Sequence, residues 1–117
     1  MNPKLVAISG PLGRQVVSLS REQLSLGREA SNDLRLGDPL VSRRHCLVTT
    51  QAGSCAIRDL DSHNGTFVNE VPVKERILEH GDQIRIGASV FLCLTQEEDA
   101  APGESTNVLL DEGSMEA

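Results

Sequence analysis

The chain has 117 residues, 38% of them hydrophobic, which is enough for one domain with a modest core. Aromatic residues make up only 2%, which argues against nucleic-acid modules that stack bases on aromatic rings. The formal net charge is −6, yet residues 97–117 hold seven of the 17 acids and no Lys or Arg. Residues 1–96 are therefore close to neutral. An acidic chain is not expected to bind a polyanion, but a near-neutral body with clustered arginines can bind a single phosphate.

Three cysteines, Cys46, Cys55 and Cys93, are too few and too far apart for a disulfide framework, and their number is odd. We therefore expect a reducing, cytoplasmic environment. The cysteines form no closely spaced pair, so we expect no metal site and no cofactor. No run approaches the roughly 18 apolar residues that a membrane span needs, so we expect no membrane partner.

The apolar residues alternate over short runs, as is typical of strands, and Gly and Asn separate the runs. Val73–His80 is less regular, and we interpret it as an extended piece that runs into a loop. No stretch keeps a helical period, so the sequence predicts an all-β sandwich or barrel over residues 1–96, followed by an acidic, disordered linker or tail at 97–117. The predicted strands, in chain order, are Lys4–Ser9, Gln15–Ser20, Gln23–Gly27, Leu34–Leu36, His45–Gln51, Cys55–Leu60, Thr66–Asn69, Gln83–Ile86 and Val90–Gln96.

Three polar segments lie where predicted strands meet loops: residues 26–33, 41–45 and 59–66. If these loops share one end of a sandwich, they bring together guanidinium groups, a serine hydroxyl and an asparagine amide. Arginine makes two parallel charge-assisted bonds to a phosphate, while serine and backbone N–H groups complete the shell. An asparagine amide both donates and accepts, so it can clamp a peptide backbone instead.

Taken in order, these segments resemble the forkhead-associated (FHA) family. The resemblance spans roughly residues 4–95, and its strength lies in the order of the segments, because each one alone is a weak signal. The segments are Leu26-Gly27-Arg28, Ser31-Asn32-Asp33, Ser42-Arg43-Arg44-His45, Asp59-Leu60, Ser62-His63-Asn64-Gly65-Thr66, Val68-Asn69 and Gly81-Asp82-Gln83-Ile84-Arg85-Ile86-Gly87.

The resemblance implies an FHA/SMAD-like β-sandwich of about eleven strands, with loops at one apex that recognise phosphothreonine. By the same resemblance, Arg28 and Ser42 would hold the phosphate, and Arg43 would face the peptide or the phosphate. His63 would line the phosphothreonine pocket, and Asn64 would bond to the peptide backbone. The structural support would come from Gly27, His45 and Gly65.

Each of these residues also has a simpler interpretation. Arg28 could be a solvated arginine that pairs with Asp33 or Asp38, and Ser42 could cap a turn. One of Arg43 and Arg44 could be a ligand while the other faces solvent, because neighbours in an extended chain point in opposite directions.

His63 could be a bystander, and Asn64-Gly65 could serve only as a hairpin turn. The turn Val68-Asn69-Glu70 departs from the family, which usually has Val-Asn-Gly there. A type I′ turn needs positive φ at both central residues, which costs a glutamate about 1 kcal/mol; the alternative is a turn of another type.

We therefore expect a phosphothreonine-peptide binding module, and not an enzyme, because no strand-turn-helix elbow surrounds Ser42. The expected context is the N-terminal domain of a larger bacterial signalling or transcriptional regulator, without direct nucleic-acid binding by this segment. The alternative is a phosphate-independent interaction or dimerisation module within a multidomain regulator. Thr106 is either part of a plain linker or a phosphorylated ligand that docks in cis or in trans.

Overall fold

The computed structural model of the protein describes residues 3–10 and 13–95, and within them the regular structure is entirely β. The predicted tail at 97–117, with Thr106, lies outside the described residues. The eleven strands confirm the predicted all-β sandwich. They are β1 (Lys4–Ser9), β2 (Val16–Ser18), β3 (Gln23–Gly27), β4 (Leu34–Arg35), β5 (Cys46–Gln51), β6 (Ser54–Asp59), β7 (Thr66–Val68), β8 (Val71–Val73), β9 (Glu75–Leu78), β10 (Gln83–Ile86) and β11 (Ser89–Leu94).

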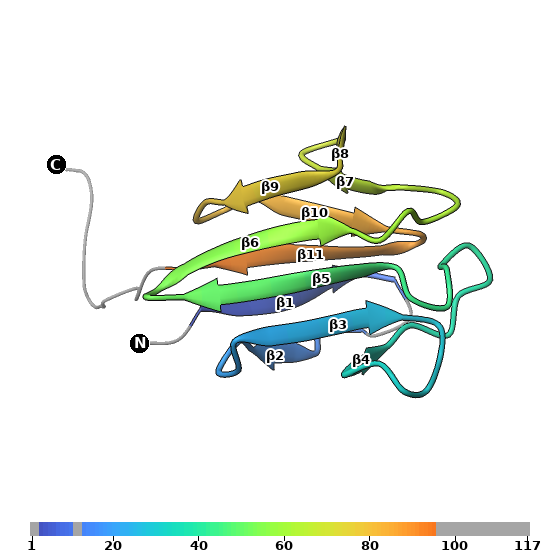
Figure 1. Cartoon of the computed structure of the whole chain (residues 1–117), viewed down its shortest axis with the longest axis horizontal. Coiled ribbons are helices and arrows are strands. Elements are labelled where there is room, and N and C mark those ends of the chain that lie inside the picture. The colour runs from blue at the N-terminus through green and yellow to red at the C-terminus, as the bar shows by residue number, and fades with distance from the viewer. Residues whose placement is uncertain (1–2, 11–12, 96–117) are drawn as a thin grey trace, which may run out of the picture.

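The strands form two sheets that pack face to face (Figure 1). One sheet has six strands in the order β2-β1-β11-β10-β7-β8, and the other has five in the order β4-β3-β5-β6-β9. The chain passes from the five-stranded to the six-stranded sheet between β6 and β7, and returns between β8 and β9. The segment between β6 and β7 is therefore a crossover loop and not a hairpin.

The core lies between the sheets and is made of alternating residues from each strand, as expected for a sandwich. In β11, Phe91 and Cys93 are buried while Leu92 between them is only partly covered. Burial raises the pKa of Cys46 and Cys93 to about 12, so these thiols are neutral and pack as small apolar groups.

The sequence analysis interpreted Val73–His80 as an extended piece that runs into a loop, and the structure has there the end of β8 and all of β9, followed by a turn. Among the described strands β9 lies at an edge and pairs only with β6, with Ala56 opposite Ile77. Leu78 is the only fully buried residue of β9, and Ile77 is 71% exposed. Because an edge strand buries so little, its sequence lacks the apolar alternation that reveals the central strands.

Figure 1 shows that the loops β3–β4, β4–β5 and β6–β7 lie at the same end of the sandwich, together with the β10–β11 turn. We call this end the apex. It contains the three polar segments that the sequence predicted to converge.

Candidate binding site at the loop apex

The first loop of the apex begins where β3 passes very close to the β4–β5 loop. A Cβ atom on Gly27 would lie 2.2 Å from the carbonyl oxygen of Arg43, so only glycine fits there. The approach allows two backbone bonds between the loops. The N–H of Arg28 donates to the Ser42 carbonyl at 2.9 Å, and the N–H of Glu29 donates to the Arg43 carbonyl at 3.2 Å.

Asn32 fastens the same two loops with its side chain. Its Nδ2 donates to the carbonyl oxygens of Glu29 and Arg43, both at 2.7 Å. The neighbouring Asp33 accepts from Arg21 at 3.0 Å and is therefore not the partner of Arg28. The sequence marked Asn32 only as part of a motif, because its contact with a residue 11 positions away depends on the fold.

His45 ties the β4–β5 loop to the β6–β7 loop from inside the protein. Its side chain is fully buried, and its Nδ1 accepts the N–H of Ser42 at 3.1 Å. Because Nδ1 is an acceptor, the ring hydrogen lies on Nε2, which donates to the Gly65 carbonyl at 2.9 Å. His45 therefore shapes the apex from below and does not face a ligand.

Asp59, at the end of β6, organises the β6–β7 loop. Its Oδ1 accepts the hydroxyls of Ser62 at 2.5 Å and Thr66 at 2.8 Å, and its Oδ2 accepts the Ser62 N–H at 3.1 Å. Burial raises the pKa of the Asp59 carboxyl, but the hydrogen bonds from Ser62 and Thr66 outweigh it and hold the pKa below its ordinary value. The carboxylate is therefore ionised, and both of its oxygens are engaged in fixing the β6–β7 loop.

Asp38 connects the β4–β5 loop to the β10–β11 turn, a contact that the sequence analysis missed. Its two carboxylate oxygens accept the N–H groups of Ala88 at 2.8 Å and Leu40 at 2.9 Å. These amides hold the pKa of the Asp38 carboxyl below its ordinary value. An aspartate in a Gly-Asp-Pro loop suggests a turn, but its partner 50 residues away could not be inferred from sequence.

Ser42 and Asn64 each use one polar function on the scaffold and keep another available. The Ser42 Oγ accepts the N–H of His63 at 2.9 Å, and its own hydroxyl hydrogen has no partner within the described part of the chain. Asn64 donates through Nδ2 to the Leu40 carbonyl at 2.7 Å, and no described residue donates to its Oδ1. The site therefore offers one free hydroxyl donor and one free amide acceptor.

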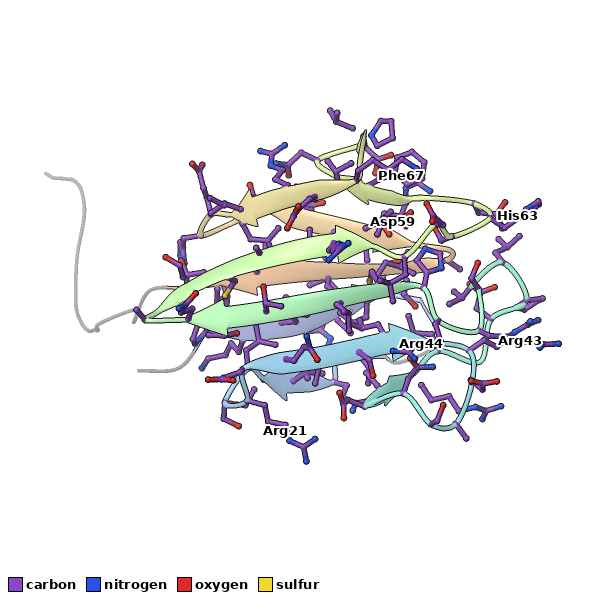
Figure 2. All side chains as sticks on the ribbon, viewed as in Figure 1. Arg21, Arg43, Arg44, Asp59, His63 and Phe67 are labelled. Carbon is purple, nitrogen blue, oxygen red and sulfur yellow. The ribbon has the colours of Figure 1, made fainter. Side chains whose placement is uncertain are left out.

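Three arginines add positive charge to the apex. Arg28, Arg43 and Arg44 are exposed, and none of the three makes an ion pair with any residue in 3–10 or 13–95. Figure 2 shows Arg43 and His63 at the tip of the loops, with Arg44 set back toward β3. Arg28, Ser42, Arg43, His63 and Asn64 thus share one end of the molecule, while Gly27, His45 and Gly65 support the loops that carry them.

This all-β sandwich belongs to a class of β-sandwiches whose polar loops, with arginines that form no ion pair in the described residues, gather at one end. Residues 24–87 match the model of the FHA domain family. GarA, the glycogen accumulation regulator of Mycolicibacterium smegmatis, is 36% identical over 91 residues, which cover 78% of this chain and 58% of GarA. The oxoglutarate dehydrogenase inhibitor of Corynebacterium diphtheriae is 39% identical over 83 residues, which cover 71% of this chain and 58% of the inhibitor.

Solved structures agree with these sequence matches. An FHA domain solved for its phosphothreonine-dependent interactions is 33% identical, with a TM-score of 0.74 over 80% of this chain and 96% of that one. EmbR of Mycobacterium tuberculosis, in complex with a low-affinity phosphopeptide, is 26% identical, with a TM-score of 0.76 over 89% of this chain and 26% of EmbR. The chain belongs to the FHA domain family, and it spans only 58% of the length of the two relatives named above.

A search of the described residues for a helix long and apolar enough to cross a membrane found none.

Proposed function

We propose that the apex binds a phosphothreonine residue of a partner protein and that the chain catalyses no reaction. The observation that carries this proposal is the convergence of three loops on unused hydrogen-bond donors. The Arg28 N–H donates to the Ser42 carbonyl, and the Ser42 Oγ accepts the N–H of His63, so these three residues are neighbours. Buried bonds from His45 and Asp59 hold these loops in place before a ligand arrives, which reduces the entropic cost of binding.

Each role follows from the groups that the scaffold leaves free. The Arg28 guanidinium supplies a fork of donors to the dianionic phosphate, and the Ser42 hydroxyl adds another donor. The backbone N–H of Arg43 has no partner in the described residues and can complete the shell together with its side chain. His63 lines the phosphothreonine pocket, and the Asn64 Oδ1 accepts an N–H of the peptide backbone. An apolar recess for the γ-methyl group favours phosphothreonine over phosphoserine.

The relatives support the same proposal. One related FHA domain makes phosphothreonine-dependent interactions, and EmbR binds a phosphopeptide. The names of GarA and the oxoglutarate dehydrogenase inhibitor point to regulators of metabolism. We assign residues 1–96 to the FHA domain and 97–117 to an acidic linker. The whole protein is then a cytoplasmic regulator that acts by protein–protein interaction in signalling or transcription control.

The test is calorimetric titration with peptide pairs that differ only in phosphorylation of one threonine. The phosphorylated peptide should bind and its unmodified twin should not. Arg28→Ala should weaken binding roughly 10- to 150-fold, because it removes a charge-assisted bond of about 1.5–3 kcal/mol. The matched control is Arg58→Ala, which removes another exposed arginine, from β6, and should leave the affinity unchanged.

Equal binding of both peptides would end the proposal. Partner binding that survives Arg28→Ala and Ser42→Ala would point instead to a phosphate-independent interaction module. An oriented phosphopeptide library would then be used to define the residues preferred around the phosphothreonine.

A further inference from the structure

A hollow lies beside the apex, between the β6–β7 loop and the β7–β8 hairpin. Its volume is about 320 Å³, at the small end of ligand sites. Its lining includes His63 and Asn64, which also belong to the proposed phosphate site, but not Arg28. We call it the Phe67 cavity. Its other principal lining residues are Phe67, Pro72, Val73 and Lys74.

The ring of Phe67 is fixed from two sides. A Cβ atom on Gly65 would lie 3.4 Å from the Phe67 Cε1, so the ring packs directly against the glycine backbone. The guanidinium of Arg85 lies 4.1 Å from the ring centroid, in a cation–π contact. Arg85 is itself held by both carboxylate oxygens of Glu70, through Nε at 3.1 and 3.2 Å and Nη2 at 3.1 Å.

Glu70 makes this contact from a backbone conformation that suits glycine better. Asn69 and Glu70 form the two-residue turn of the β7–β8 hairpin, with φ values of 52° and 67°. Positive φ at both positions is the type I′ pattern, which non-glycine residues rarely adopt. A strained residue that persists next to a binding surface points to a function for its side chain, and here that side chain fixes Arg85 on Phe67.

We propose that the Phe67 cavity is a subsite for one apolar side chain of the phosphothreonine peptide, and that Glu70 and Arg85 are positioning residues that hold its aromatic wall. This proposal rests on the proposed function, because the peptide reaches the cavity by passing Asn64. Because His63 and Asn64 belong to the phosphate site and also line the cavity, the apolar side chain lies only a few residues from the phosphothreonine in an extended peptide.

The walls of the cavity favour an apolar occupant. The Asp59 carboxylate also lines the cavity, and it accepts three hydrogen bonds from Ser62 and Thr66 within the β6–β7 loop. The charge of Arg85 is paired with that of Glu70. Phe67, Pro72 and Val73 supply apolar surface. Lys74 at the rim is exposed, so its ammonium can stay in water while its aliphatic stem adds to the apolar wall.

The experiment uses alanine-based heptapeptides with a central phosphothreonine and a fluorescent label, in which one flanking alanine at a time becomes leucine. Fluorescence anisotropy gives the ratio of affinities for the leucine and alanine peptides at each position. One position should show a preference for leucine of roughly tenfold, as expected for partial burial of the extra carbons. The unphosphorylated all-alanine peptide is the reference for phosphate dependence.

Glu70→Gly removes the Glu70–Arg85 ion pair that holds Arg85 against the Phe67 ring, which we call the clamp. The same change relieves the backbone at position 70, so the variant keeps its fold. It should reduce the leucine preference to about threefold or less, because the loss of one paired charge at the cavity wall removes only part of the contact with leucine. The affinity for the all-alanine phosphopeptide should stay unchanged. Phe67→Leu, which keeps an apolar side chain but removes the ring, should do the same. Arg21→Ala breaks an exposed ion pair outside the cavity lining and should keep the full preference.

Failure of the subsite proposal can be distinguished from failure of the proposed function. If the phosphopeptide binds tightly with no leucine preference at any position, or if the preference survives both Glu70→Gly and Phe67→Leu, the subsite is overturned and the proposed function stands. If phosphorylated and unphosphorylated alanine peptides bind equally, the proposed function itself fails and the subsite proposal fails with it.

Discussion

The apex has a buried layer and an exposed layer, and the two layers use different side chains. The buried layer consists of His45, Asp59 and the Thr66 hydroxyl, whose polar atoms bond to the loop backbone, to the Ser62 hydroxyl or to each other. The exposed layer contains Arg28 and Arg43, whose guanidinium groups make no ion pair with a described residue. The first layer determines where the loops lie, and the second determines what they can bind.

This division makes the two properties separable by mutation. A change in the buried layer should lower stability and affinity together, because it moves the loops. A change in the exposed layer should lower affinity alone, because the scaffold does not depend on it. Ser42 lies between the layers, since its Oγ accepts the His63 N–H while its hydroxyl hydrogen is free of any described partner.

The largest expected effect is that of His45→Ala. It leaves the Ser42 N–H and the Gly65 carbonyl without their partner and opens a void in a fully buried position. We expect a loss of about 2–4 kcal/mol in the free energy of unfolding by urea titration, together with a clear loss of phosphopeptide affinity. A variant with the stability of the wild type would show that the histidine does not brace the apex.

Ser42→Ala tests the boundary between the layers. Because it removes a donor to the phosphate, it should weaken phosphopeptide binding roughly 10- to 150-fold in calorimetry. The free energy of unfolding should fall by no more than about 1 kcal/mol, since the His63 N–H that it releases belongs to an exposed residue. A larger loss of stability than of binding free energy would place Ser42 in the buried layer.

Asp59→Asn should lower the stability by about 1–2 kcal/mol near neutral pH, because an amide cannot accept all three donated bonds. The pKa of Asp59 is depressed in the folded protein, so its contribution is complete above the unfolded pKa of about 3.9 and is lost as the pH falls through the folded pKa. The stability difference between wild type and variant should therefore shrink below about pH 4. Unfolding curves between pH 2.5 and 7 would show it, and a constant difference would contradict the ionised carboxylate.

The sequence predicted those strands best that bury one face against the core. The ranges Lys4–Ser9, Gln23–Gly27 and Gln83–Ile86 match the structure to the residue, because their apolar residues alternate as the burial does. β9 was predicted only as an extended piece without strand bounds, because an edge strand has few buried positions and its sequence carries no such pattern. The alternation of apolar residues reflects burial, and it is absent where a strand is held mainly by backbone hydrogen bonds.

For the site, the order of polar segments located the three loops but not the bonds between them. Asn32 and Asp38 fasten loops across 11 and 50 residues, and no local pattern reveals such distant partners. The direction of Arg43 relative to Arg44 likewise depends on the loop conformation (Figure 2). The sequence did reveal a backbone penalty at Glu70, but not that Arg85 would compensate for it 15 residues later.

The smallest expected effect concerns two turns that belong to neither the buried nor the exposed layer of the apex. Their comparison measures how much the Glu70–Arg85 clamp beside Phe67 contributes to stability. Ala52 in the β5–β6 turn and Glu70 in the β7–β8 turn both have positive φ, so glycine at either position should relieve about 1 kcal/mol of strain. Ala52→Gly loses no side-chain contact and should gain this amount in thermal unfolding. Glu70→Gly also loses a pair whose glutamate is 72% exposed, worth about 0–1 kcal/mol, so its gain should be smaller. The difference between the two gains is the contribution of the clamp to stability. If Glu70→Gly were the more stabilising of the two, Glu70 would not hold Arg85 against the ring.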